Sequence, residues 1–200
     1  MTILNRKERD RQLRRSDILK AAEHLFAIKG YNKATIRDIA KEAQYATGTV
    51  YLHFKDKEAL FFALFEEKLK NLLSIIEEKI KQVKDARSKL RIFVREGLDF
   101  FAKNSNFFKI FVSESDRLLI EKRILKSPAG QQFQDYTVRL IRQAQEQRVI
   151  SSELAARQAA DVFFAILKIV GIECFKEKNG KLPDLSDLIL RYFLYGTANK

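Results

Sequence analysis

Residues 46–54 place hydrogen-bonding side chains where a short helix would not need them for packing. If this segment is helical, Val50 and Phe54 face inward. The outward positions then hold Thr47, Gly48, Thr49, Tyr51, Leu52 and His53. Small and hydrogen-bonding residues of this kind can contact phosphate oxygens and base edges of DNA. Gly48 lowers helix stability by about 1 kcal/mol relative to alanine, so either close approach to DNA or helix packing has to explain it.

Two earlier helices are expected to position this segment. Apolar residues recur at helical spacing from Ile18 to Phe26, and Gly30 can end that first helix in a left-handed conformation. Thr35 and Asp38 form a near capping box for a second short helix, which ends before the third begins. Three helices then fit within about 40 residues, the helix-turn-helix arrangement that lays a recognition helix in the DNA major groove.

Residues 14–62 closely resemble the DNA-binding domain of TetR-family transcriptional regulators. The features at family spacing are Thr35, Gly48, the aromatic cluster at 51–54, and the Lys55, Asp56, Lys57 and Glu58 start of the next helix. The resemblance implies a homodimer that binds a palindromic double-stranded DNA operator. It also implies that phosphates are contacted by Thr35, Tyr51, His53 and Lys57. Base edges, on the same resemblance, face Arg37, Thr47, Gly48 and Thr49.

The turn before the third helix departs from the family pattern. Gln44, Tyr45 and Ala46 stand where the family usually has Gly-Val-Ser. Gln44 adopts positive φ less easily than glycine, so a strained or reshaped turn is expected. Ala46 cannot cap the helix with its side chain, unless the helix starts one residue later with Thr47 as its cap. Tyr45 either packs beneath the turn or contacts DNA.

The rest of the chain is also expected to be helical, which makes the fold all-α with about nine helices. Asp56 caps a long helix that keeps apolar spacing to Val83 and joins two modules. Further helices are expected from Asp85 or Ser88, from Phe107, from Pro128 behind a Ser127 cap, from about residue 154, and from Asp184 or Ser186. We expect a DNA-binding head in residues 1–55 and an effector-binding and dimerising body in residues 56–200, which together act as a repressor of transcription until a ligand binds.

The body is crowded with phenylalanine. Six of the 16 phenylalanines fall within residues 93–111, more than one helical stripe can bury, and they indicate either plain core or an apolar effector pocket. An aromatic or acyl-chain effector would suit such walls. The predicted lining residues are Phe93, Phe100, Phe101, Phe107, Phe108, Phe111, Phe133, Tyr136, Phe163, Phe164 and Leu167.

The last two helices carry more apolar surface than one small module should bury. We therefore expect them to form an isologous four-helix interface between two copies of the chain. The predicted dimer residues are Val162, Phe163, Ile166, Ile169, Val170, Leu188, Ile189, Tyr192 and Phe193.

The net charge of +12 favours an acidic partner, and residues 1–57 are the most basic part, with 13 Lys and Arg against 7 Asp and Glu. The densest section, residues 6–15, is either a solvated helix extension or an arm that contacts phosphate. Rival interpretations are a basic helical protein that binds nucleic acid or a membrane surface without sequence preference, and the same fold acting as an activator. The cluster at 51–54 argues against non-specific binding.

The sequence offers no catalytic or metal-binding pattern. Its two histidines, His24 and His53, are too few for a histidine metal site. Cys174 is interpreted as a core residue rather than a nucleophile. We therefore expect no enzyme activity, no cofactor and no metal. The lone cysteine, the lack of a signal peptide, and an apolar stretch broken by Asp161 and Lys168 predict a cytoplasmic protein without a membrane span.

Overall fold

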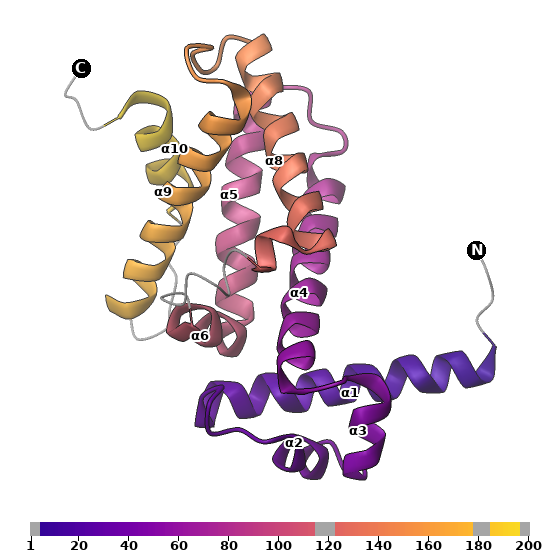
Figure 1. Cartoon of the computed structure of the whole chain (residues 1–200). Coiled ribbons are helices and arrows are strands. Elements are labelled where there is room, and N and C mark those ends of the chain that lie inside the picture. The colour runs from indigo at the N-terminus through magenta and orange to yellow at the C-terminus, as the bar shows by residue number, and fades with distance from the viewer. Residues whose placement is uncertain (1–4, 115–122, 178–184, 197–200) are drawn as a thin grey trace.

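The computed structural model describes residues 5–114, 123–177 and 185–196, and within these ranges the chain is helical with short connections. The first three helices form a small head: α1 (Arg6–Lys29), α2 (Ile36–Glu42) and α3 (Thr47–His53). From this head the long helix α4 (Lys57–Ile80) rises into a helical body (Figure 1). The expected all-α fold, with a helix-turn-helix head joined to a helical body, is confirmed.

In the described residues, the body contains α4, five further helices and one helical turn at residues 123–126, which comes directly before α8. They are α5 (Ala86–Lys103), α6 (Ser105–Glu114), α8 (Pro128–Glu146), α9 (Ala156–Glu177) and α10 (Ser186–Tyr195). Helix α5 packs against α4, α8 and α10, while α9 packs against α8 and α10 (Figure 1). Among the helices described here, none is long and apolar enough to cross a membrane.

Local capping signals set most of the helix starts. Asp56 accepts a hydrogen bond from the Ala59 backbone N–H at 2.7 Å, and Ser127 accepts one from Gly130 at 3.2 Å. Asp85, rather than Ser88, caps α5. Helix α9 begins at Ala156, two residues later than expected, because residues 152–154 form a bend.

The core of the head includes the first turns of α4. The Phe61 ring lies 5.9 Å from that of Phe26 and 4.8 Å from that of Tyr31, centroid to centroid. Leu60 and Phe61 are both buried. The packing unit of the head therefore extends past the expected boundary at residue 55, because α4 supplies one wall of its core.

A half-buried cation joins head and body. The Lys68 ammonium on α4 lies 2.9 Å from a Glu23 carboxylate oxygen on α1 and donates to Asn104 Oδ1, between α5 and α6, at 2.8 Å. Helix α6 itself packs on α1. The body therefore contacts the head through both α4 and α6, so a shift of either helix is felt by α1.

Candidate DNA interface and effector chamber

The turn between α2 and α3 is left-handed at Gln44, whose φ is 59°. The Tyr45 backbone N–H closes this turn on the Ala40 carbonyl at 2.9 Å. A non-glycine residue in this conformation costs roughly 1 kcal/mol. The turn thus keeps a tight shape although the sequence supplies glutamine where glycine would be free of strain.

Tyr45 packs beneath the turn. Its hydroxyl donates to Asp17 Oδ2 of α1 at 3.0 Å, and its ring is partly buried against the head core. That hydrogen bond to a carboxylate, together with burial, raises the pKa of Tyr45. Of the two roles left open for Tyr45, the structure supports packing.

Helix α3 presents a polar face to solvent. It begins at Thr47, with Ala46 at the N-cap and no side-chain cap, so the alternative in which Thr47 caps the helix is wrong. Thr47 and Tyr51 are exposed, Thr49 is half-buried, and Val50 is buried as expected. Arg37 is exposed on the adjacent α2. These side chains are placed where a helix-turn-helix presents groups to base edges and phosphates.

Gly48 is not required by packing within the protein. A Cβ built at this position meets no atom within 4 Å, so the space beside it is open. Gly48→Ala should therefore stabilise the free protein by up to about 1 kcal/mol, since alanine favours the helix. If the backbone approaches DNA here, the same methyl group should weaken operator binding. Thermal unfolding and fluorescence anisotropy measure the two effects, and unchanged or tighter operator binding would contradict the close approach.

Two of the four predicted phosphate donors are used inside the protein. The Thr35 hydroxyl donates to Asp38 Oδ2 at 2.9 Å and accepts from the Asp38 N–H at 3.1 Å, and the Thr35 backbone N–H donates to Asp38 Oδ2 at 3.2 Å, which completes the expected capping box. The Lys57 ammonium donates to the carbonyls of Tyr31, Asn32 and Ala34 at 2.7, 3.3 and 3.0 Å.

An ammonium has three N–H donors, so these carbonyls account for all those of Lys57. The assignment of Lys57 to phosphate contact is therefore corrected: it holds the α1–α2 connection onto α4. Thr35 is likewise corrected from a phosphate donor to the cap of α2. The cap was expected from the sequence, but the role of Lys57 could not be, because Lys57 and its acceptors are more than 20 residues apart.

His53 lies at the end of α3, beside the amino-terminal half of α1. Burial and the guanidinium groups of Arg11, Arg15 and Arg14 lower the pKa of His53. Its imidazole is therefore neutral near pH 7 and retains one ring N–H donor. The clustering of these arginines around α3 was not predicted from the sequence.

The body encloses an apolar chamber of about 90 Å³ between α4, α5, α6, α8 and α9. Its wall is almost entirely aliphatic and aromatic. The lining residues are Phe65, Leu69, Leu72, Ile76, Phe93, Gly97, Leu98, Phe101, Phe107, Ile124, Leu125, Gly130, Phe133, Phe164, Leu167 and Lys168. Dry walls with one polar group at the edge are typical of sites that bind an apolar ligand.

The structure brings most of the predicted lining residues to this wall, namely Phe93, Phe101, Phe107, Phe133, Phe164 and Leu167. Phe100, Tyr136 and Phe163 are corrected, because they are not among the residues that line this chamber. Phe100 and Phe163 are buried core, and Phe163 lies between the rings of Phe93 and Phe193. The side chains of Phe108 and Phe111 lie outside the described residues. Sequence analysis missed the α4 residues, since their apolar stripe was interpreted as a linking helix.

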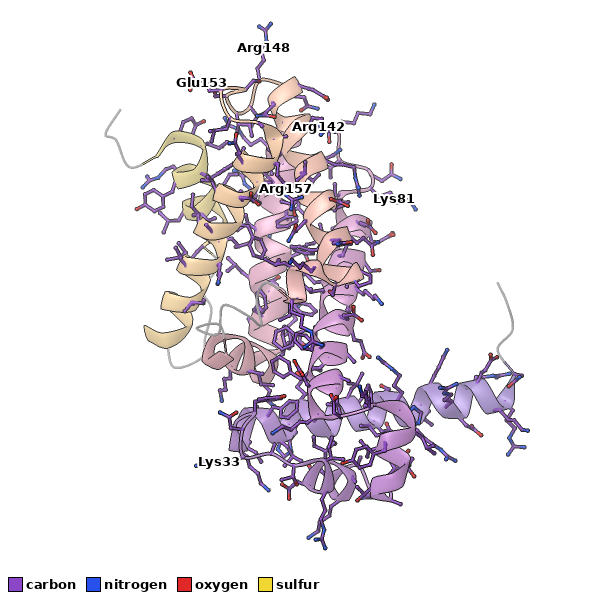
Figure 2. All side chains as sticks on the ribbon, in the orientation of Figure 1. Lys33, Lys81, Arg142, Arg148, Glu153 and Arg157 are labelled. Carbon is purple, nitrogen blue, oxygen red and sulfur yellow. The ribbon has the colours of Figure 1, made fainter. Side chains whose placement is uncertain are left out.

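A groove of about 300 Å³ adjoins the chamber between α8 and α9. It shares Leu125, Phe133, Phe164 and Lys168 with the chamber. Its lining also includes the charged residues Arg157 and Asp161, whose guanidinium and carboxylate groups lie 3.9 Å apart; Figure 2 labels Arg157 on the body. The chamber and the groove therefore adjoin each other at residues of α8 and α9.

The outer faces of α9 and α10 expose apolar side chains. Val162, Ile169 and Leu188 are exposed, and Ile169 is 61% accessible. Ile166, Val170, Tyr192 and Phe193 are half-buried. Ile189 is fully buried within this single chain, so its assignment to the dimer face is corrected. Phe163 is removed from that face for the same reason.

No group of three or more His, Cys, Asp or Glu side chains suited to a metal ion occurs in the described part of the chain. Cys174 lies on α9, but its side chain is outside what the structure describes.

The sequence matches known regulators over its head and over most of its length. Residues 18–64 match the sequence model of bacterial regulatory proteins of the tetR family. The fatty acid metabolism regulator protein of Bacillus subtilis is 26% identical over 184 residues, which cover 92% of this chain and 95% of that protein. The transcriptional activator FasR of Mycolicibacterium smegmatis is 31% identical over 56% of this chain and 50% of its own length.

Solved structures with the same fold include regulators of fatty acid metabolism. The fatty acid degradation regulator FadR from Bacillus halodurans superposes with a TM-score of 0.81 at 25% identity, covering 94% of this chain and 97% of that one. FadR from Bacillus subtilis, solved in complex with stearoyl-CoA, has a TM-score of 0.75 at 22% identity and covers 92% and 99%. At that identity the second likeness concerns the fold alone.

Proposed function

This chain belongs to the tetR family of bacterial transcriptional regulators, and we propose that it is a repressor released from DNA by a long-chain acyl thioester. The observation that carries the effector class is the apolar chamber walled by α4, α5, α6, α8 and α9. A chamber of this chemistry favours a hydrocarbon chain over a polar metabolite, because a polar group buried there would lose its hydrogen bonds to water.

The adjoining groove supports an amphipathic effector. Lys168 lines both the chamber and the groove, and Arg157 lines the groove. An acyl chain in the chamber would leave its polar head group beside these cations. The full-length relative in Bacillus subtilis is a regulator of fatty acid metabolism, which agrees with an acyl ligand.

Release of the protein from DNA follows from the small size of the effector chamber. A chamber of about 90 Å³ is far smaller than the roughly 300 to 1,000 Å³ of ordinary ligand pockets, and it is too small for a long acyl chain. Binding must therefore move the wall, and parts of the wall contact the head. Phe107 of α6 packs on Phe65 of α4 with ring centroids 4.8 Å apart, and α6 packs on α1.

A second connection runs through the turn at residues 123–126. Ile124 and Leu125 belong to the chamber wall, while Arg123 pairs with Glu58 and stacks over the Phe62 ring at 4.3 Å. Glu58 and Phe62 lie at the start of α4, next to the head. An effector that displaces this turn therefore alters how the head is held, and it favours the conformation that does not fit the operator.

The remaining assignments belong to the same proposal. Two copies of the chain pair through α9 and α10, and the paired heads bind a palindromic operator in the cytoplasm. Residues 1–55 supply the DNA contacts, and residues 56–200 supply effector binding and dimerisation. Arg37, Thr47, Gly48 and Thr49 face the bases, while Tyr51 and His53 face phosphates. As in its regulator relatives, the output is control of transcription rather than catalysis.

Stearoyl-CoA titrated against the full chain on an operator obtained by binding selection tests this function. We expect it to raise the unfolding temperature of the free protein and to release DNA in the same concentration range, because one binding event drives both effects. Coenzyme A alone should do neither. Stearic acid shows whether the thioester head group is needed. If no acyl-CoA from 12 to about 18 carbons releases the operator, the effector assignment is wrong.

A further inference from the structure

The amino-terminal half of α1 is a helix with no core of its own. Every side chain from Asn5 to Arg14 is exposed, and this half extends past α3 and α4 away from the body (Figure 1). It is nevertheless well capped: Asn5 Oδ1 accepts from the Glu8 N–H at 3.0 Å, and the Glu8 carboxylate accepts from the Asn5 N–H at 3.4 Å. Helix formation here is thus supported by local sequence rather than by burial.

This extension forms one wall of a shallow groove of about 410 Å³, and the end of α3 forms the other. The lining residues are Lys7, Asp10, Arg11, Arg14, Leu52 and His53. Lys7, Arg11 and Arg14 follow i, i+4, i+7 spacing, so they share one face of α1 over about 10 Å. Against these three cations, the groove contains one carboxylate, from Asp10.

The groove is continuous with the surface that faces DNA. Leu52 and His53 belong both to α3 and to the groove, and Leu52 is 78% exposed. Whatever α3 docks against therefore also lies at the mouth of the groove. Arg15 anchors the geometry, because it pairs with Glu67 of α4 at 3.3 Å and stacks over Phe54 at 5.3 Å.

We propose that this groove binds the phosphate backbone of duplex DNA beside the bases that α3 faces, which lengthens the footprint of each head. The inference rests on DNA binding by the head and adds a contact surface to it. Guanidinium and ammonium groups at this spacing suit the repeating charges of one DNA strand. A membrane surface fits less well, because a helix that lies in a lipid interface needs an apolar face, and residues 6–15 contain one apolar side chain, Leu13.

The test compares the full chain with the triple variant Lys7→Ala, Arg11→Ala and Arg14→Ala on two duplexes. One duplex is trimmed to the selected operator, and the other carries about ten further base pairs on each side, roughly one helical turn. On the long duplex we expect the triple variant to bind at least about tenfold more weakly at 0.15 M salt. The slope of log affinity against log salt should fall by about 2 to 3 per head. On the trimmed duplex the loss should be smaller, and the preferred bases should not change.

Two controls show whether an effect of the triple variant comes from the lost charges in the groove, from altered folding, or from the lower net charge of the whole protein. Replacing Arg11 and Arg14 by lysine keeps the charge and should keep the salt slope near that of the parent. Arg142→Ala with Arg148→Ala removes exposed cations at the end of the body opposite the head (Figure 2) and should leave both duplexes bound as before.

If the parent and the triple variant bound the long duplex with equal affinity and equal salt slope, the groove would not bind DNA, while DNA recognition by α3 would stand. If binding selection with the parent protein enriched no DNA sequence, specific DNA recognition by the head would be wrong, and the proposal for the groove would be wrong with it. If the triple variant instead lost binding to phosphatidylglycerol vesicles while its affinity for the long duplex was unchanged, the groove would be a lipid site and the proposal would be wrong.

Discussion

Ile169→Asp is expected to convert the dimer to a monomer and to lower operator affinity by at least about a hundredfold. Ile169 is 61% exposed on α9, at the edge of the groove between α8 and α9, and is among the exposed apolar side chains of α9 and α10. In an isologous interface one substitution places a carboxylate on both sides of the twofold axis. A buried, unpaired charge costs several kcal/mol, and each 1.4 kcal/mol is tenfold in the dimerisation constant.

The loss of operator affinity follows from the loss of the second head. A monomer binds one half-site of a palindrome and keeps the base contacts of that half-site. It loses the gain in affinity that comes from two linked heads binding both half-sites. Sedimentation velocity at micromolar concentration gives the oligomeric state, and anisotropy gives the affinity. Ile28→Asp is the matched control for sedimentation, since Ile28 is equally exposed at 61% but lies on α1. A variant that remains dimeric, or a parent that is monomeric, would contradict this interface.

Gly97→Leu should produce a repressor that binds its operator but no longer responds to long-chain acyl-CoA. Gly97 lies on α5 in the chamber wall, where the cavity is about 90 Å³. An isobutyl group at this position occupies the space that the first part of an acyl chain needs. We expect at least about a tenfold higher effector concentration for release, which corresponds to 1.4 kcal/mol of lost binding.

Gly97→Ala is the matched control. Its Cβ would lie 4.0 Å from Leu167 Cδ2, an ordinary van der Waals contact, so it fits without displacing the wall. Alanine should raise helix stability by up to about 1 kcal/mol and leave effector release nearly unchanged. If Gly97→Leu still responded at the parent's effector concentration, the chamber would be a packing defect of the core, and the effector would bind elsewhere.

Local sequence determined where most helices begin. The pairs Thr35–Asp38, Asp56–Ala59 and Ser127–Gly130 are each three residues apart, so these caps depend only on the local sequence. The scarcity of Pro and Gly predicted an all-helical chain, because few residues in the sequence interrupt a helix. The third-helix motif indicated DNA binding because its outward residue types lie within a single helix, and the helical repeat alone sets which of them face outward.

The effector chamber depended on tertiary structure. Its walls come from five helices, and the phenylalanine cluster could predict an apolar region but not which rings would enclose a space. Phe163 is part of the core because Phe93 and Phe193 cover it. The α4 residues line the chamber because α5 and α8 pack against α4. Which face of a helix is covered depends on the neighbours it meets, and those are distant in sequence.

The sequence by itself therefore determined the class of this protein: an all-helical regulator with a helix-turn-helix head, because those signals are periodic or lie within a few residues. Tertiary structure decided which groups are available for binding. Lys57 is tied to the carbonyls of Tyr31, Asn32 and Ala34, and the groove beside α3 exists only because α1 passes next to Leu52 and His53. The physical reason is that a hydrogen-bond donor already satisfied inside the fold cannot serve a ligand, and its partner is set by how helices pack.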